Sequence, residues 1–265
     1  METVLRLPRR LLIVIGVVGA AATLGTTQAE GAGRRELGRD ATAFVLTRRG
    51  TVISSNWSGY AVHKRRTTFT DVQGSWVQPS ATCPTSQRQY ASFWVGIDGF
   101  NSNSVEQIGT DADCAGRNRP KYYAWYEMYP APLSKINLSV SPGDRISPEV
   151  SVSGSTFTLS VTNKTTDRTF STTADATARL SSAEWVAEAP SGCTPSSCTV
   201  LPLADFGTAR FSGSYATGNG HTGSISDSAW GHDRIVMETS SGTVKARPSS
   251  LSSDGTAFSV AWRHS

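Results

Sequence analysis

The sequence predicts an all-β protein folded as a sandwich of two antiparallel sheets. From Asn56 to the C-terminus, short runs of alternating apolar and polar residues are separated by Gly, Pro, Asn, Asp and Ser. This is the pattern of half-buried strands joined by turns, and no stretch has helical periodicity of useful length. The 265 residues suffice for one β domain and a leader, because single all-β domains often reach this size. Many short strands at this spacing favour a two-sheet sandwich.

Residues 1–29 have the pattern of a secretory signal peptide. Three arginines precede an apolar run from Leu11 to Ala22, and the segment ends at Thr27-Gln28-Ala29, where small residues suit cleavage. The alternative is a membrane anchor, but the uninterrupted apolar stretch is short for a bilayer span. We therefore expect a secreted (extracellular) protein that has no membrane association after the signal is cleaved.

Residues 30–55 are polar and basic, which predicts a pro-segment or a flexible lead-in. Residues 1–55 hold eight basic and four acidic side chains, whereas the rest of the chain holds seventeen of each. The net charge of +4 therefore comes entirely from the part before Asn56. Because the mature domain has no excess of positive charge, we expect no nucleic-acid partner. We also expect a monomer.

The domain predicted over residues 56–265 contains fourteen segments with the period and composition of strands. Turns are predicted at Pro142-Gly143-Asp144 and at Asp254-Gly255. The predicted strands are 58–62, 71–78, 92–98, 105–111, 122–129, 135–140, 146–152, 156–163, 168–172, 182–188, 210–215, 233–238, 243–247 and 257–262.

Four cysteines behind a secretory leader predict two disulfides, for which three pairings are possible. Cys193 and Cys198 lie in a Pro/Ser/Gly-rich stretch, close enough to close a small ring. We therefore prefer Cys193–Cys198 together with Cys83–Cys114. Zinc is the other common use of cysteine, but these spacings fit no metal template and the four histidines are scattered. No metal site and no cofactor are expected.

Three of the predicted strands, 92–98, 105–111 and 122–129, carry an unusual mixture of side chains on one face. Because side chains alternate across a strand, one parity carries Phe93, Val95 and Ile97, an ordinary core face. A plain solvent face would carry Thr, Ser and Lys, so the opposite parity indicates a lined cleft, with chance co-occurrence as the alternative. That parity carries two indoles, three carboxylates and an amide, namely Trp94, Asp98, Gln107, Asp111, Trp125 and Glu127.

The usual catalytic signatures are missing from the sequence. There is no Gly-x-Ser-x-Gly elbow, no Asp-Thr-Gly or Asp-Ser-Gly pair, no His-Glu-x-x-His and no phosphate-binding glycine loop. Carboxylate and amide chemistry remains. In the predicted strand 182–188, Glu184, Val186 and Glu188 share one face. A glutamate that ends a strand, as Glu188 does, is more often a solvated edge residue, so a functional role needs further support.

That support is a resemblance to the glutamic peptidases, also called eqolisins or the G1 peptidase family. The matching segments occur in the family's order and at similar separations, and together they cover the chain from about Asn56 to the C-terminus. The resemblance implies a concanavalin-like sandwich of two bent antiparallel sheets with the active site on the concave face. The segments are Asn56-Trp57-Ser58-Gly59, Phe93-Trp94-Val95-Gly96-Ile97-Asp98-Gly99, Gln107-Ile108-Gly109-Thr110-Asp111, Ala124-Trp125-Tyr126-Glu127-Met128-Tyr129-Pro130 and Ala183-Glu184-Trp185-Val186-Ala187-Glu188.

The resemblance also implies roles for individual residues. The catalytic dyad of the family falls on Gln107 and Glu188, and the supporting positions fall on Trp94, Asp98, Asp111, Trp125 and Glu127. Met128 stands where an aromatic residue is common, and residues 100–104 lack a cysteine often found there. These departures leave both dyad positions occupied.

The implied activity is that of a secreted acid endopeptidase acting on protein or peptide substrates. Glu188 as a carboxylate would take a proton from the attacking water, and the Gln107 amide would donate to the developing oxyanion. Two alternatives remain open on the same kind of sandwich. A glycoside hydrolase would use Glu127 and Glu188 as its acid and base, and a carbohydrate-binding module would use the aromatics as sugar platforms. A glycosidase, however, has no evident use for Gln107 at the centre.

Overall fold

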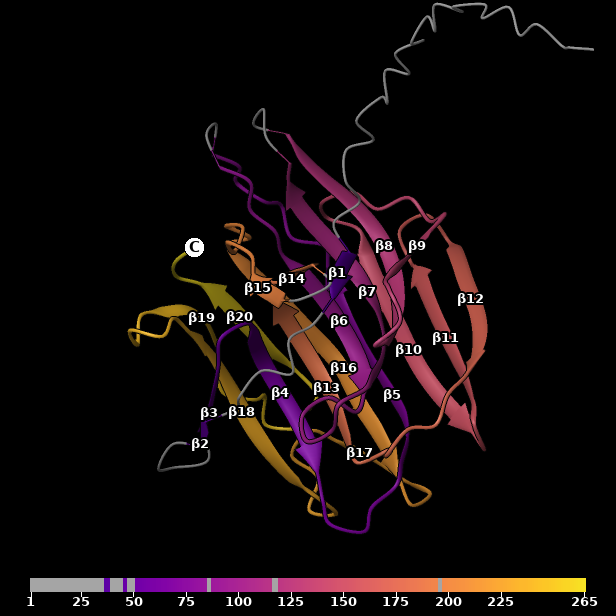
Figure 1. The fold of residues 1–265 in the computed structure, drawn as a ribbon. Coiled ribbons are helices and arrows are strands. Elements are labelled where there is room, and N and C mark those ends of the chain that lie inside the picture. Colours follow the sequence, from indigo (N-terminus) through magenta and orange to yellow (C-terminus); the bar gives the residue numbers. More distant parts are fainter. Residues whose placement is uncertain (1–35, 39–44, 47–50, 85–86, 116–118, 195–196) are drawn as a thin grey trace, which may run out of the picture. The chain divides into compact units, whose positions relative to one another are not determined.

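The computed structural model (Figure 1) describes residues 36–38, 45–46, 51–84, 87–115, 119–194 and 197–265. The predicted signal peptide and most of the predicted lead-in lie outside these ranges. The described residues form strands, turns and irregular connections, and no helix among them is long and apolar enough to cross a membrane.

Twenty strands make up the described part of the chain. They are β1 (Glu36–Gly38), β2 (Val45–Leu46), β3 (Thr51–Ser54), β4 (Trp57–His63), β5 (Phe69–Val77), β6 (Ser92–Ile97), β7 (Val105–Cys114), β8 (Pro120–Tyr129), β9 (Ser134–Ile136), β10 (Arg145–Ser153), β11 (Thr156–Asn163), β12 (Arg168–Asp175), β13 (Ser182–Glu188), β14 (Ser191–Thr194), β15 (Ser197–Val200), β16 (Thr208–Gly218), β17 (His221–Ser224), β18 (Gly231–Glu238), β19 (Val244–Pro248) and β20 (Phe258–Trp262).

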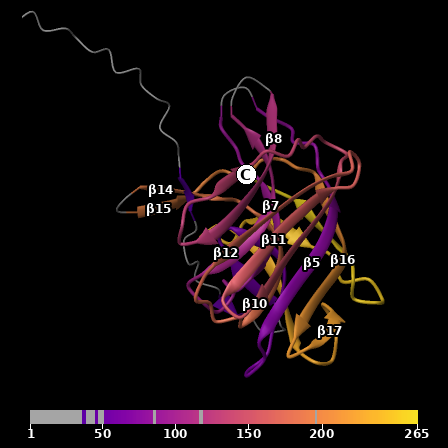
Figure 2. The same cartoon turned by 90° about the vertical axis from the view of Figure 1, so that its right-hand side faces the viewer.

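Antiparallel pairing runs through one long series of strands that folds back on itself into two layers. The first sheet has the order β9-β8-β7-β6-β13-β4-β18. β19 pairs with both β18 and β20 and so leads into the second sheet, which has the order β20-β16-β5-β10-β11-β12. Figure 2 shows β12, β11, β10, β5 and β16 side by side in this second layer. The predicted antiparallel sandwich is confirmed.

The main core lies between the two sheets. β6, β7 and β13 pack against β5 and β10 without pairing to them, and the Trp185 indole Nε1 on β13 donates to the backbone oxygen of Gln73 on β5 at 2.8 Å. Phe93, Val95 and Ile97 of β6 are fully buried in this core. The predicted core parity of β6 is therefore correct.

A second, smaller apolar cluster covers the opposite side of the first sheet, which we call the far face. Trp57, Trp94, Trp125 and Val186 belong to this cluster, and the rings of Trp57 and Trp94 meet edge to face with centroids 4.9 Å apart. Because successive residues of a strand point to opposite faces, the same four strands supply both clusters. The far face carries the candidate site.

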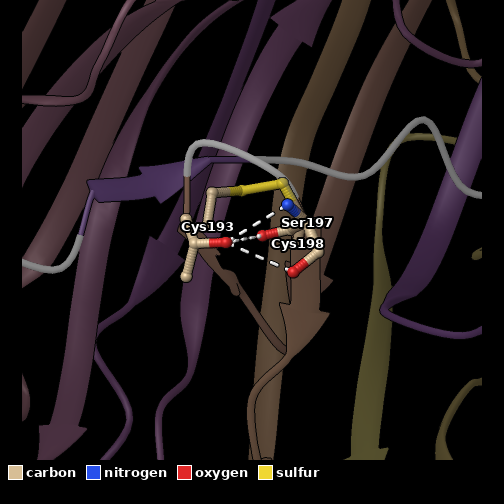
Figure 3. The surroundings of a disulfide bond; sticks show 4 residues. Cys193, Ser197 and Cys198 are labelled. Carbon is tan, nitrogen blue, oxygen red and sulfur yellow. Dashed lines mark hydrogen bonds between the residues drawn. A yellow bond between two sulfur atoms is a disulfide. The ribbon is translucent and has the colours of Figure 1, made fainter.

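Both predicted disulfides are present. Cys83–Cys114 joins the chain before β6 to the end of β7. Cys193 and Cys198 lie opposite each other on β14 and β15 and form the second bond, shown in Figure 3. The sequence predicted only a loop here, whereas the hairpin of β14 and β15 pairs with β1 in a separate three-stranded sheet. Strands of four residues are too short to show a period that would reveal them.

The structure differs from the expected flexible lead-in over residues 51–54. These residues form β3, which runs parallel to β18, and Val52 is fully buried in the cluster on the far face. Thr51, Val52 and Ile53 are all β-branched and suit a strand. The sheet therefore begins upstream of Asn56.

Candidate active site

Four neighbouring strands, β13, β6, β7 and β8, carry the candidate site. Their registers align side chains of the far face in three rows that cross the strands. One row holds Glu184, Gly96, Gln107 and Glu127; the next holds Val186, Trp94, Gly109 and Trp125; the third holds Glu188, Ser92, Asp111 and Tyr123.

Six of the seven predicted site residues lie in these rows, all on the far face: Trp94, Gln107, Asp111, Trp125, Glu127 and Glu188. Gln107 and Glu188 stand in the first and third rows, on β7 and β13, with β6 between them. Both are shut off from solvent, with exposures of 0% and 2%. A buried amide and a buried carboxylate need hydrogen-bond partners, and the surrounding side chains supply them.

Gly109 makes room for the two indoles of the middle row. It lies between Trp94 and Trp125 in the register. A Cβ at this position would come within 2.2 Å of the Phe93 carbonyl oxygen and 2.7 Å of the Trp94 Cβ. Any side chain here would therefore push β6 and β7 apart. The glycine in the sequence Gln-Ile-Gly-Thr-Asp is required by the packing of the row.

Glu188 accepts hydrogen bonds on both carboxyl oxygens. The Asn56 amide Nδ2 donates to Oε1 at 3.0 Å, and the Trp94 indole Nε1 donates to Oε2 at 2.8 Å. Both donors are neutral N–H groups, and together they hold the carboxyl group in place. Asn56 itself is held by Ser54, which exchanges hydrogen bonds with its backbone and side chain.

Gln107 is oriented by Glu127 on the neighbouring strand. Its amide nitrogen donates to Glu127 Oε2 at 2.5 Å. An amide nitrogen carries two hydrogens, so this bond fixes the plane of the amide and the direction of the second N–H. Asp111, another residue of the predicted supporting set, has a different role.

Asp111 organises the aromatic side chains of β8. Its Oδ1 accepts from the Trp125 indole at 2.5 Å, and its Oδ2 accepts from the Tyr123 hydroxyl at 2.6 Å. Burial raises the pKa of Asp111 from 3.8 to about 6, against the opposing effect of these donors. Asp113, whose Oδ2 lies 2.8 Å from the same hydroxyl, has its pKa raised well above 3.8 by burial and by Asp111.

Asp98 does not lie in the rows, contrary to the sequence prediction. β6 ends at Ile97, and Asp98 has a positive φ of 69°, which turns the chain away from the sheet. Its carboxylate accepts from the backbone nitrogens of Leu180 and Ser181 at 2.7 and 2.8 Å and from the Ser181 hydroxyl. Asp98 therefore anchors the connection that leads into β13. Alternation could not reveal this, because it assumes that the strand continues.

Sequence reasoning missed two residues of the site, Asn56 and Tyr123, and one buried carboxyl group on the core side of β7, Glu106. Asn56 was part of a matched segment, yet nothing in the sequence showed that its amide reaches Glu188. Tyr123 shares the parity of Trp125, which was the available signal. Glu106 is buried on the other face of β7, where burial and the charge of Asp98 raise its pKa from 4.5 to about 8.

Within the described ranges, no group of three or more His, Cys, Asp or Glu side chains is placed to hold a metal ion.

Comparison with known proteins identifies the family. The model of the Peptidase A4 family matches residues 55–262. Aspergillopepsin-2 of Aspergillus niger is 30% identical over 211 residues, and the match covers 69% of this chain and 72% of that protein.

Solved structures of similar proteins agree with this match. Scytalido-glutamic peptidase with a peptide-based transition-state analogue aligns with a TM-score of 0.68 at 25% identity, covering 79% of this chain and 98% of that one. SCP-B, an eqolisin in complex with the tripeptide Ala-Ile-His, aligns with a TM-score of 0.64 at 25% identity over the same shares. Aspergilloglutamic peptidase from Aspergillus niger aligns with a TM-score of 0.56 at 29% identity, covering 66% and 99%.

The family model covers far more than half of the chain, and its fold is the one described above. The predicted fold class and the predicted resemblance are both confirmed. The chain belongs to the Peptidase A4 family, the glutamic peptidases or eqolisins, and is a peptide-bond hydrolase.

Proposed function

We propose that the protein is a secreted acid endopeptidase in which Glu188 and Gln107 form the catalytic dyad. The observation that carries this proposal is the arrangement of these two side chains. They lie on one face of the first sheet, on β13 and β7 with β6 between them. Asn56 and Trp94 donate to the Glu188 carboxyl group, and Gln107 donates to Glu127. One group is equipped to accept a proton and the other to donate a hydrogen bond.

The reaction would begin with a water molecule between Glu188 and the scissile carbonyl carbon. A Glu188 oxygen takes one proton from the water while the water oxygen bonds to the carbon. The carbonyl oxygen becomes anionic and accepts the second N–H of the Gln107 amide. Glu188 then gives its proton to the amide nitrogen as the C–N bond breaks, which releases an amine and a carboxylic acid and restores the carboxylate.

The chemistry of the two groups explains why an amide stands at position 107. A glutamine is a neutral donor at every pH, so its hydrogen bond to the oxyanion does not depend on protonation. Its bond to Glu127 Oε2 directs the amide before substrate arrives. Such preorganised donors lower the barrier because no reorientation is needed as charge develops.

The neighbours Trp94 and Trp125 hold the carboxylates rather than the substrate. Trp94 donates to Glu188 and Trp125 donates to Asp111, and each is almost fully buried. Both indoles thus donate hydrogen bonds to carboxylates from buried positions, whereas an aromatic ring that stacks on a sugar is exposed to it. Family membership likewise does not favour the glycoside hydrolase or carbohydrate-binding alternatives.

The Gln107→Glu variant tests the dyad. A glutamate at this position can donate only when it is protonated, so residual cleavage of denatured casein should shift to lower pH than in the unaltered enzyme. A full pH profile from about 3 to 7, spanning the ordinary pKa of glutamate, is measured for both proteins. Unchanged cleavage by Gln107→Glu across that range would contradict the oxyanion role.

Secretion and a monomeric state are part of the same proposal and rest on the sequence. Residues 1–29 have the pattern of a signal peptide. Expression of the full chain should release into the medium a protein whose N-terminus, determined by sequencing, lies beyond residue 29. Size-exclusion chromatography with light scattering should give the mass of one chain. Retention of residues 1–29 in a cell-bound product would contradict secretion.

A further inference from the structure

A basic pocket lies at the end of β4, beside the first sheet. It has a volume of about 520 Å³ and is lined by His63, the three consecutive cations Lys64, Arg65 and Arg66, and Arg179 and Asn101. No carboxylate is among its lining residues. A larger cavity of about 830 Å³ is lined by the second sheet and the chain between β19 and β20, in the other layer from Gln107 and Glu188.

Two of the cations in the basic pocket are tied to the backbone. The Lys64 ammonium donates to the carbonyl oxygen of Ala229 at 2.6 Å, and the Arg179 guanidinium donates to that of Asn101 at 2.8 Å. Carbonyl oxygens hold these side chains in place but do not cancel their charge. The fixed cations therefore leave the pocket positively charged.

Two carboxylates beside the pocket are already engaged. Asp233 pairs with His63 Nε2 at 2.7 Å. Asp98 is fully buried and accepts from the backbone nitrogen and the hydroxyl of Ser181. The lining itself holds four cations and no carboxylate, so the pocket attracts an added anion.

The basic pocket is continuous with the far face that carries the dyad. The His63 ring stacks on Phe100 with centroids 5.2 Å apart, and Phe100 packs on the cluster that contains Trp57 and Trp94. In the register, His63 lies opposite Ser182, six residues along β13 from Glu188. At about 3.4 Å per residue this separation is about 20 Å.

We propose that the basic pocket is a substrate subsite that takes an acidic side chain about four to six residues from the scissile bond. This inference rests on the proposed function, because it assumes that substrate lies extended over the far face. An extended peptide advances about 3.3 Å per residue, so about six residues reach from Glu188 to the pocket. An aspartate or glutamate side chain of the substrate supplies the negative charge that the four cations of the pocket attract.

Three peptides with one central sequence test this proposal. One is neutral, one has two aspartates about five residues to the N-terminal side of the cleaved bond, and one has them to the C-terminal side. Cleavage is measured above about pH 4, where free aspartate is ionised. One of the two acidic peptides should be cleaved with a kcat/KM about three- to tenfold above the neutral peptide, since exposed ion pairs contribute modestly. The gain should lie in KM.

Charge-removing variants locate the effect. Arg65→Gln combined with Arg179→Gln should reduce the preference for the acidic peptide to near unity. The matched control is Arg168→Gln, which removes one exposed arginine on β12, away from the pocket, and should keep the preference. Because Arg179 also holds Asn101, Arg65→Gln alone is measured as well, and thermal unfolding of each variant checks the fold.

The outcomes separate the subsite from the dyad. Equal kcat/KM for all three peptides, equal preference for both acidic peptides, or a preference that survives the double variant would overturn the subsite while leaving the peptidase intact. If no peptide is cleaved at any pH, the proposed function fails. The pocket is then tested by fluorescence anisotropy with labelled acidic and neutral peptides, and equal affinities would overturn it.

Discussion

The two faces of the first sheet are made by the same strands, yet they bury different chemistry. Towards the second sheet point Phe93, Val95 and Trp185, whereas the far face holds Gln107 and Glu188 in a net of hydrogen bonds. Burying a large apolar side chain contributes about 1.5–3 kcal/mol. Burying an amide or a carboxylate costs free energy unless each polar atom is paired. One face therefore stabilises the sheet, and the other is maintained for its reactivity.

This difference predicts that substitutions on the two faces separate activity from stability. Glu188→Gln should have the largest effect on activity, a loss of several orders of magnitude, because the amide cannot take a proton from water. The fold should persist, since the amide is nearly isosteric and Trp94 and Asn56 remain as neighbours. Proteolysis of denatured casein and circular dichroism measure the two effects.

The control for Glu188→Gln is Glu184→Gln, which changes a second buried glutamate on the same strand and face. It should retain far more activity, because the resemblance to the family places the catalytic group at the second glutamate. More than a tenth of the activity left in Glu188→Gln, or a larger loss in Glu184→Gln, would show that the dyad is assigned to the wrong residue.

On the core face, Phe93→Ala should lower the free energy of unfolding by about 3–5 kcal/mol. The side chain is fully buried and meets Phe206 edge to face with centroids 5.3 Å apart, so its removal leaves a cavity. Urea unfolding measures the loss, and the folded fraction should still cleave casein. The comparison variant Phe170→Ala, on the partly buried surface of β12, should cost less. If both variants lose the same free energy of unfolding, the buried core between the sheets contributes no more to stability than the partly buried edge at β12.

Removing each disulfide should lower the free energy of unfolding, measured in urea, by a different amount. The bond Cys83–Cys114 closes a separation of 31 residues, and Cys193–Cys198 closes one of 5. In the chain-entropy description their removal costs about 4 and about 2 kcal/mol respectively. The double variants Cys83→Ser/Cys114→Ser and Cys193→Ser/Cys198→Ser are compared in urea. If removing Cys193–Cys198 lowers the free energy of unfolding more than removing Cys83–Cys114, the stabilisation comes from the β14–β15 hairpin rather than from loop closure.

The fold followed closely from the sequence because alternation is a local property. The strands 92–98, 105–111 and 122–129 correspond to β6, β7 and β8, and the parity that separates Phe93 from Trp94 is the parity of the structure. β3 and the β14–β15 hairpin were not predicted, since four residues carry too little pattern. Their pairing depends on distant partners, β18 and β1.

The site could be predicted only in part. Parity placed Gln107, Trp125 and Glu127 on one face, but no local pattern shows which carboxylate meets which donor. Asp98 shows the limit, because its positive φ takes it out of the strand to bind Leu180 and Ser181. Glu188 reaches Asn56 across 132 positions of sequence, a contact that only the assembled sheet reveals.

The last prediction concerns the pH dependence of stability and comes from buried carboxyl groups around the site. Burial raises the pKa of Asp111 from 3.8 to about 6 and that of Glu106 from 4.5 to about 8, and the pKa of Asp113 is raised as well. A raised pKa in the folded state means that the protonated form is favoured by folding. The resulting stabilisation is fully present below the unfolded value and is lost as pH rises through the folded value. The domain should therefore be more stable at about pH 4 than at about pH 7.

Replacing Asp111 by Asn assigns a share of this pH dependence to one residue. The amide is neutral at every pH and can still accept from the Trp125 indole, so the stability lost between about pH 4 and pH 7 should shrink by about 1–3 kcal/mol, at about 1.4 kcal/mol per pKa unit. Urea unfolding in a Glu188→Gln background avoids self-digestion. The control is Asp254→Asn, which removes an exposed carboxylate. The pKa of Asp254 is lowered by the Ser252 hydroxyl and by Thr256, so its ionisation favours folding, the opposite of Asp111. This control should therefore not reduce the loss of stability between the two pH values. If Asp111→Asn loses as much stability between the two pH values as the Glu188→Gln parent, the ionisation of Asp111 does not oppose folding. The greater stability at acidic pH must then come from Glu106 and Asp113.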